Sequence, residues 1–250
     1  SGDDFASYPE GESDHLACGS GRRRVEGEVS MPLLKTWTEE NGRWGIWQVT
    51  ETMEELCACL SDDVVRQEFE RLKAPSRKLE YLAVRVLLKT MLGKEVRIGH
   101  EPSGKPFLTG GEYHVSISHT KGYVAVGLHE SAQPGIDIEV YGERVRKVES
   151  RFIREDEMPE RARMESREEL YQLLLHWSAK ETMYKVLDMA EVDFLQHLKV
   201  CPFKLSSSGT FAGESYRKAD KARFLIHYLI HPEFVCTYCL NTEARRTNNG

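Results

Sequence analysis

Two short stretches of the sequence carry acidic and basic residues at spacings that suit chemistry. The first is GIDIEV, in which Asp137 and Glu139 alternate with aliphatic residues. In a β-strand these two carboxylates project from the same face, roughly 7 Å apart. Two oxygen donors on one rigid strand suit Mg²⁺. The same pattern is also typical of a half-buried strand with a solvated acidic face, so both interpretations stay open.

The second stretch is LLLHWSAKETMYKVL, whose apolar residues recur at helical spacing. The apolar stripe passes through Trp177 and then reaches Glu181 and Lys185, where the periodicity predicts apolar residues. On a solvated face the two charges would form an i,i+4 ion pair worth a few tenths of a kcal/mol. On an inward face an uncompensated carboxylate costs several kcal/mol. A divalent cation shared with Asp137 and Glu139 would remove that cost, and Lys185 would then face an anion bound to the metal.

Further residues suit the binding of phosphate. Arg77 and Lys78 fall in the first turn of an expected helix, where free N–H groups and the helix dipole favour anions. Lys105 lies in the turn SGKPFL, and Ser118 and His119 end the stretch VSISHT. Each residue also has an interpretation without a function. Arg77 and Lys78 could be ordinary surface cations, Lys105 a loop residue, and Ser118 and His119 structural residues. With the three carboxylates, the set suits Mg²⁺-dependent chemistry on a pyrophosphate.

Helices and strands must position these residues. Thr52 and Glu55 form a capping box that predicts one helix, and Ser61 is expected to cap the next, DDVVRQEFERL. A third helix is expected from Pro75 to a stop at Gly93. The charged segment between GIDIEV and the LLLHWSAKE helix is expected to hold a further helix.

Strands are expected around these helices. The first is predicted at 44–49, and YHVSISHTKGYVAVGL predicts a hairpin that turns at Lys121 and Gly122. GIDIEV is the next strand, and alternation returns after residue 190 in LKVCPFKLS, ARFLIHYLI and EFVCTYCL. The composite is an α+β protein with two halves, each of which pairs a long helix with a small sheet. We expect a disordered leader at 1–30, halves at 31–132 and 133–244, and a tail at 245–250.

Composition narrows the class of protein. The chain has 250 residues and a formal net charge of −6, which disfavours a nucleic-acid binder. It lacks a run of about 18 apolar residues and a signal-peptide pattern, so we expect a cytoplasmic protein that does not enter membranes. The six cysteines include CAC in an expected helix and CTYC in an expected strand. Both spacings make the paired side chains diverge, which favours reduced cysteines over a zinc site.

Four motifs together resemble a known family. GIDIE followed by WSAKETMYK is similar to the paired motif of 4′-phosphopantetheinyl transferases, and GKPF and SISHT match two further blocks in the right order. The resemblance runs from about residue 60 to 200 and is to the larger, monomeric, surfactin-synthetase-activating type. It implies two similar α+β halves related by a pseudo-twofold axis, with coenzyme A in the cleft between them.

The resemblance also implies an activity, that of a holo-[acyl-carrier-protein] synthase. The phosphopantetheine arm of coenzyme A moves to a serine of an apo acyl or peptidyl carrier protein, and adenosine 3′,5′-bisphosphate is released. Asp137, Glu139 and Glu181 then hold Mg²⁺, Lys185 neutralises developing charge, and Glu181 or a metal-bound water takes the serine proton. The residues implied to hold the 3′-phosphate, ribose and pyrophosphate are Arg77, Lys105, Ser118 and His119, with Lys78 a weaker candidate.

Other interpretations stay open. A non-catalytic module that binds coenzyme A or a carrier would keep the same cleft, although the intact acidic set argues against it. A metal-dependent nuclease is disfavoured by the negative net charge and by Tyr141, which stands where such sites commonly place Lys. The basic residues between the two motifs suit either an acidic carrier or a solvated surface. They are Arg144, Arg146, Lys147, Arg151 and Arg154.

Overall fold

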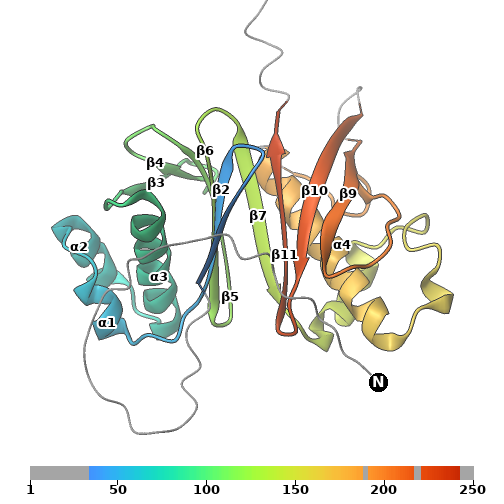
Figure 1. Ribbon diagram of the computed structural model, residues 1–250, viewed down its shortest axis with the longest axis horizontal. Coiled ribbons are helices and arrows are strands. Elements are labelled where there is room, and N and C mark those ends of the chain that lie inside the picture. The colour runs from blue at the N-terminus through green and yellow to red at the C-terminus, as the bar shows by residue number, and fades with distance from the viewer. Residues whose placement is uncertain (1–33, 188–190, 217–220, 243–250) are drawn as a thin grey trace, which may run out of the picture.

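The computed structural model describes residues 34–187, 191–216 and 221–242, and it confirms a mixed α+β fold (Figure 1). The expected leader at 1–30 and tail at 245–250 lie outside these ranges. Up to the end of the first sheet the elements are β1 (Leu34–Glu39), β2 (Gly42–Gln48), α1 (Met53–Ala58), α2 (Asp63–Arg71), α3 (Pro75–Leu92), β3 (Ile98–His100), β4 (Pro106–Leu108), β5 (His114–Thr120) and β6 (Tyr123–His129).

The rest of the chain begins at the strand that carries GIDIEV. Its elements are β7 (Gln133–Val140), the 3₁₀ turns η1 (Glu143–Lys147), η2 (Glu149–Arg151) and η3 (Arg161–Arg163), α4 (Ser166–Leu187), β8 (Leu198–Val200), β9 (Ser208–Ser215), β10 (Ala222–Ile230) and β11 (Phe234–Asn241).

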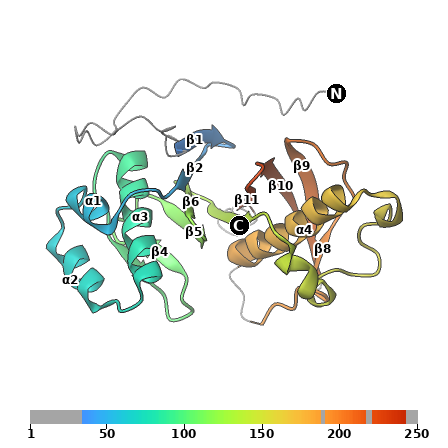
Figure 2. The same cartoon turned by 90° about the horizontal axis from the view of Figure 1, so that it is seen from below.

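Two antiparallel sheets lie between two long helices. Strands pair in the order β1-β2-β6-β5 in the first sheet and β7-β11-β10-β9-β8 in the second. Buried residues of β2, β6, β7 and β11 pack the inner faces of the sheets against each other. Helix α3 covers the outer face of the first sheet and α4 covers that of the second. Seen from below, α3 and α4 lie on opposite sides of the paired sheets (Figure 2).

Local sequence signals set the helix boundaries. Thr52 and Glu55 form the expected capping box at the start of α1, with backbone-to-side-chain distances of 2.9 and 3.2 Å. Helix α3 begins at Pro75 and ends at Gly93, whose φ of 74° is the left-handed conformation that glycine adopts at low cost. The predicted stop of this helix at Gly93 is confirmed, and Pro75 is its first residue.

The predicted cap of α2 is wrong by one residue. Asp62 is the N-cap, and its carboxylate accepts a hydrogen bond from the backbone N–H of Val64 at 3.0 Å. Ser61 lies one position too early, and its hydroxyl donates instead to Glu95 at 2.9 Å. Ser and Asp cap equally well, so only the position of the first helical turn decides between them.

The strands of the second sheet differ from the prediction in two places. LKVCPFKLS contributes only β8, because Pro202 has no N–H to donate to a ladder. Strand β9 was not predicted, since Gly209 and Gly213 weaken its β pattern. Its backbone is nevertheless satisfied by β10, against which it pairs from Ser208 to Ser215.

The first half contains three further strands that the sequence did not indicate. They are β1, which pairs with β2, and the short pair β3 and β4 on either side of the SGKP turn. The hairpin of β5 and β6 turns at Gly122, with φ of 81°, as predicted.

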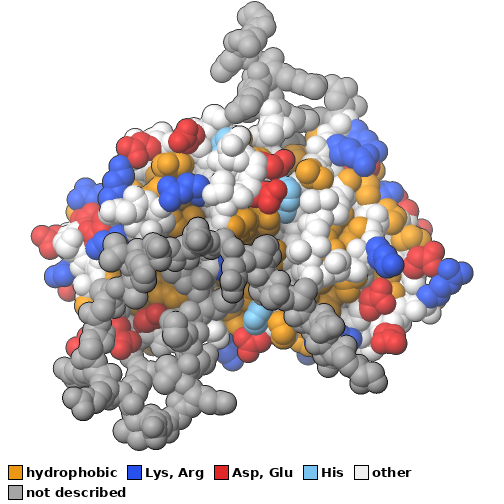
Figure 3. Space-filling view, in the orientation of Figure 1, with side chains coloured by type: hydrophobic (Ala, Val, Ile, Leu, Met, Phe, Trp, Pro, Cys, Tyr) orange, Lys and Arg blue, Asp and Glu red, His pale blue; other side chains and the backbone are white. Residues whose placement is uncertain are grey.

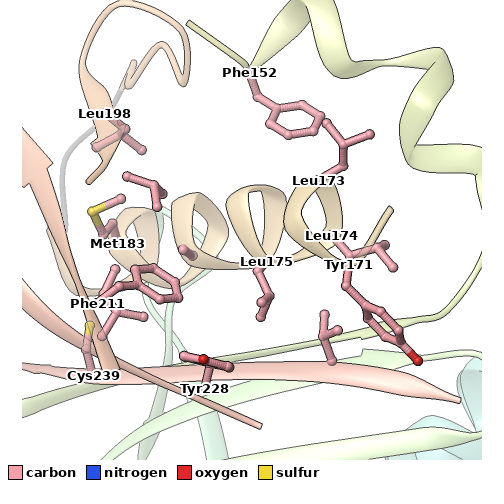
Figure 4. Packing of buried hydrophobic residues seen from close by; sticks show 14 of the residues in the cluster. Phe152, Tyr171, Leu173, Leu174, Leu175, Met183, Leu198, Phe211, Tyr228 and Cys239 are labelled. Atoms are coloured by element: carbon pink, nitrogen blue, oxygen red, sulfur yellow. The ribbon is translucent and has the colours of Figure 1, made fainter. Parts of the chain in front are cut away.

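The core beneath α4 is assembled from elements far apart in the sequence. Phe152 and Leu173 pack on one side of the helix, and Phe211 and Tyr228 pack between it and the sheet (Figure 4). Cys239 belongs to this core, whereas Cys236 points into the core between the sheets. Their divergence is as predicted from strand geometry.

The charged segment after β7 forms 3₁₀ turns in place of the helix expected there. Its basic residues are partly paired: Arg146 bonds Glu143 at 2.6 Å and Arg154 bonds Asp156 at 2.8 Å. These two arginines therefore have acidic partners within the same segment. On the molecular face shown in Figure 3, basic and acidic side chains are interspersed.

The pseudo-twofold relation between the two halves stays a prediction, and so does the boundary between residues 132 and 133.

None of the helices in the described ranges has the length and hydropathy to span a bilayer.

Candidate active site

Helix α4 is held tightly against β7 and β11. The hydroxyls of Ser178 and Thr182 lie 2.9 and 2.8 Å from the hydroxyl of Thr237 on β11. On β7, a Cβ added at Gly135 would lie 2.7 Å from the carbonyl oxygen of Thr182, so only glycine permits this approach. The close contact places the preceding residue of the helix, Glu181, within range of the charge of Asp137 on β7.

Asp137 lies at the centre of this arrangement and is 4 % exposed. Its Oδ1 is 3.5 Å from the ammonium of Lys185 and 3.3 Å from the hydroxyl of Ser118. Lys185 also donates to the carbonyl oxygen of Ile136 at 2.7 Å, which holds it at the strand. The second carboxylate oxygen, Oδ2, is buried and accepts no hydrogen bond from any residue that the structure describes.

The two glutamates are electrostatically tied to Asp137. Burial, followed by the negative charge of Asp137, raises the pKa of Glu139 to about 9. Burial and the same charge raise the pKa of Glu181 to about 7, and Lys185 opposes the rise. Trp177 donates a hydrogen bond from Nε1 to Glu139 at 3.1 Å. Strand and helix therefore bring all three predicted carboxylates within range of one another's charge.

This donor set fits a hard divalent cation. Carboxylate oxygens are the ligands that Mg²⁺ prefers, and the unpartnered Oδ2 of Asp137 offers a buried acceptor. A bound Mg²⁺ would neutralise the repulsion among the carboxylates and polarise a phosphoryl oxygen. Within the described ranges, no three acidic, His or Cys side chains have donor atoms gathered as closely as a metal centre requires. The magnesium site therefore stays a prediction.

A line of contacts leads from Asp137 toward α3. Ser118 contacts Asp137, and the next residue on β5, His119, lies 3.2 Å from Glu80 through its Nδ1. Arg77 stands three residues before Glu80 on α3, and it is exposed. Residues three apart share one side of a helix, so Arg77 lies on the side of α3 that carries Glu80.

The remaining residues that were predicted to bind phosphate, Lys78, Lys105 and Ser118, lie in the first half of the chain. Lys78 is half-buried, with its ammonium 4.9 Å from the ring centre of Phe69, which directs it toward α2. Lys105 is half-buried between β3 and β4, where the preceding Gly104 has a φ of 90°. Ser118 is buried, and its hydroxyl accepts the backbone N–H of Ile138 at 3.1 Å.

A family comparison covers the part of the chain that carries the carboxylates. Residues 133–239 match the 4′-phosphopantetheinyl transferase superfamily. The match includes Asp137, Glu139, Glu181 and Lys185, whereas the phosphate-binding candidates precede it. No curated protein matches the chain.

Three residues near the superfamily domain's acidic cluster were not assigned roles from the sequence. Ser116 lies two residues before Ser118, a spacing that places both hydroxyls on one strand face and was available as a signal. Trp177 was interpreted as core, although a buried indole usually needs a partner for its N–H. Glu80 carried no signal, because its contact with His119 is long-range.

Proposed function

We propose that this protein transfers the 4′-phosphopantetheine arm of coenzyme A to a serine hydroxyl of an apo acyl or peptidyl carrier protein. One observation carries the proposal: burial and the charge of Asp137 raise the pKa values of Glu139 and Glu181, and all three residues lie in the segment that matches this superfamily. Burying acidic side chains next to one another is a costly arrangement, and a metal-bound pyrophosphate is the ligand class that offsets the cost.

The proposed reaction is a phosphoryl transfer from coenzyme A to the serine. The serine Oγ attacks the phosphorus that carries the pantetheine arm, and a new serine–phosphate bond forms. The bond to the second phosphate breaks, so adenosine 3′,5′-bisphosphate leaves. Glu181 takes the serine proton, and Lys185 stabilises charge that develops beside Asp137. Asp137, Glu139 and Glu181 would hold the Mg²⁺.

The first half of the chain is proposed to hold the nucleotide end of coenzyme A. His119 continues the line of contacts from Asp137 to Glu80 on α3, and Arg77 precedes Glu80 by three residues on the same helix. This arrangement suits a ligand with a pyrophosphate at one end and a 3′-phosphate at the other. Lys105 is proposed to contact the same nucleotide from its turn, with Lys78 a weaker candidate. Ser118 is proposed to act next to the pyrophosphate, where it already contacts Asp137.

The proposal includes the type of enzyme. We propose a monomer of the surfactin-synthetase-activating type that acts in the cytoplasm. The support is that one chain supplies both the carboxylates on β7 and α4 and the candidate cations on α3 and β5.

The test is a measurement of carrier mass. The protein is incubated with coenzyme A, Mg²⁺ and each of several apo carriers, and intact mass spectrometry should show the gain of one phosphopantetheine arm. A carrier whose acceptor serine is replaced by alanine should gain nothing. Coenzyme A binding without mass gain on any carrier would favour a non-catalytic module, and cleavage of DNA would favour the nuclease.

A further inference from the structure

Lys180 of the WSAKE motif is completely buried and lies away from the carboxylate cluster. Its ammonium donates to Glu157 at 2.7 Å and to the carbonyl oxygens of Phe152 and Phe194, the latter at 3.1 Å. All three partners lie outside α4. The lysine therefore joins the helix to the segment before it and to the segment after it.

Glu157 extends these connections. Its Oε1 accepts the backbone N–H of Arg154 at 2.9 Å, and its Oε2 accepts that of Val200 on β8 at 2.7 Å. Each oxygen of the buried carboxylate is thus satisfied. A buried ion pair adds little net stability over apolar residues of similar volume, but removal of one partner leaves an uncompensated buried charge and is strongly destabilising.

The residues held by Lys180 also enclose Trp177. The ring centre of Phe152 lies 5.2 Å from that of Trp177 in an edge-to-face arrangement, and the ring centre of Phe194 lies 5.5 Å from it. Trp177 in turn donates its N–H to Glu139 at 3.1 Å. One continuous set of contacts leads from the Lys180 ammonium to a carboxylate of the candidate active site.

We propose that Lys180 and Glu157 are positioning residues, which fix the rings of Phe152 and Phe194 around Trp177 and thereby orient Glu139. The effect of this orientation on activity rests on the proposed function, in which Glu139 is a ligand of Mg²⁺. It assigns no contact with substrate to Lys180. Residues that orient a metal ligand typically change metal affinity or activity by about 10- to 100-fold when lost.

The decisive measurement is the ¹⁵N–¹H spectrum of the tryptophan indoles. The chain has four tryptophans, and the other three, Trp37, Trp44 and Trp47, lie on β1 and β2. The Trp177 resonance is identified by its loss in Trp177→Phe, and its position in Glu139→Ala, which removes the acceptor, defines the unbonded indole. This readout needs neither metal nor catalytic activity.

Lys180→Met should move the Trp177 resonance toward that of an unbonded indole and leave the other three in place. If this variant fails to fold, all four resonances collapse, and the uncharged pair Lys180→Met with Glu157→Gln then carries the test. Lys199→Met is the matched control, because Lys199 also pairs with a nearby acid, Asp156, at 2.9 Å. A folded Lys180 variant whose Trp177 resonance stays in place would overturn the proposal.

The second readout is the Mg²⁺ requirement of carrier modification. The Mg²⁺ concentration for half-maximal rate should rise about 10- to 100-fold in the Lys180 variant, and saturating Mg²⁺ should restore most of the rate. An unchanged requirement would also overturn the proposal. If the wild-type protein modifies no carrier, the proposed function fails, and the indole spectra still decide whether Lys180 orients Trp177.

Discussion

The hydroxyl of Ser116 accepts a hydrogen bond from the backbone N–H of Ile136 at 3.0 Å. Ser118 does the same for Ile138, two residues further along both strands, at 3.1 Å. These serines lie on β5, the edge strand of the first sheet, and the isoleucines lie on β7, the edge strand of the second. Side-chain hydroxyls thus replace a backbone ladder where the two sheets meet, next to Asp137.

Ser116→Ala should destabilise the protein by about 1–3 kcal/mol, because the buried N–H of Ile136 would lose its acceptor. Denaturant unfolding followed by circular dichroism measures the loss. Ser76→Ala, at an exposed position of α3, is the control and should change the free energy of unfolding by less than about 0.5 kcal/mol. Equal effects of the two substitutions would show that the hydroxyl does not join the sheets.

Gly135→Ala should weaken the contact between β7 and α4. The added Cβ would lie 2.6 Å from a methyl carbon of Val186 and 2.7 Å from the carbonyl oxygen of Thr182, so the helix must move. Overpacking of this kind costs about 1–3 kcal/mol, and displacement of Glu181 should lower the rate of carrier modification. At Gly142, just beyond the other end of β7, an added Cβ meets open space. Gly142→Ala should therefore leave the melting temperature unchanged, and a similar loss there would contradict the steric argument.

Glu181→Gln should abolish carrier modification while the protein stays folded. Glutamine has nearly the same size but cannot take the serine proton, and loss of a general base costs about 10²–10⁴-fold in rate. Intact-mass kinetics measure the rate, and circular dichroism checks the fold. Glu168→Gln replaces an exposed glutamate in the first turn of the same helix and should retain wild-type activity. Full activity in Glu181→Gln would remove its assigned role.

Arg77→Ala should weaken coenzyme A binding. One charge-assisted hydrogen bond to phosphate contributes about 1.5–3 kcal/mol, so the dissociation constant should rise roughly 10- to 100-fold in a calorimetric titration. Arg163→Ala removes an arginine that is 84 % exposed and pairs with Glu160 in the other half of the chain. That control should bind coenzyme A normally. An unchanged constant for Arg77→Ala would place the 3′-phosphate elsewhere.

The buried imidazole of His176 should make the protein less stable in acid. Burial lowers the pKa of His176 to about 4, from an ordinary value near 6.5. The unfolded chain therefore binds a proton below pH 6.5 that the folded protein does not bind until about pH 4. The contribution of His176 to stability therefore falls by roughly 3 kcal/mol as the pH drops through this window. The raised pKa values of Glu139 and Glu181 contribute in the opposite direction, because the folded protein holds their protons where the unfolded chain releases them.

The prediction is tested by replacing His176, whose surroundings contain two charged groups. The charges of Glu157 and Lys180 act on the imidazole in opposite directions, and its Nδ1 lies 2.7 Å from the carbonyl oxygen of Gln172. His176→Gln should remove the His176 contribution, a change of roughly 3 kcal/mol between pH 6.5 and 4 in the dependence of the unfolding free energy on pH. The exposed His100→Gln should leave it as it is. A difference in unfolding free energy between the wild type and His176→Gln that does not change with pH would contradict the prediction.

Features that depend on a few neighbouring residues follow directly from the sequence. The capping box of Thr52 and Glu55, the helix stop at Gly93 and the turn at Gly122 all form as predicted, because each is a contact within one turn of chain. The alternation in GIDIEV likewise places its isoleucines between the sheets. By contrast, β9 is a strand because β10 is available to pair with it, which its own residues do not indicate.

The sequence by itself determined the four motifs, the α+β class and the inward direction of Glu181. Periodicity states which face of a helix is buried, but it does not state what that face meets. Only the tertiary structure decided that Glu181 lies within range of the charge of Asp137, and that the neighbouring Lys180 points instead to Glu157. The physical reason is distance along the chain: these partners approach because two sheets and a helix pack together, and that packing is a property of the whole core.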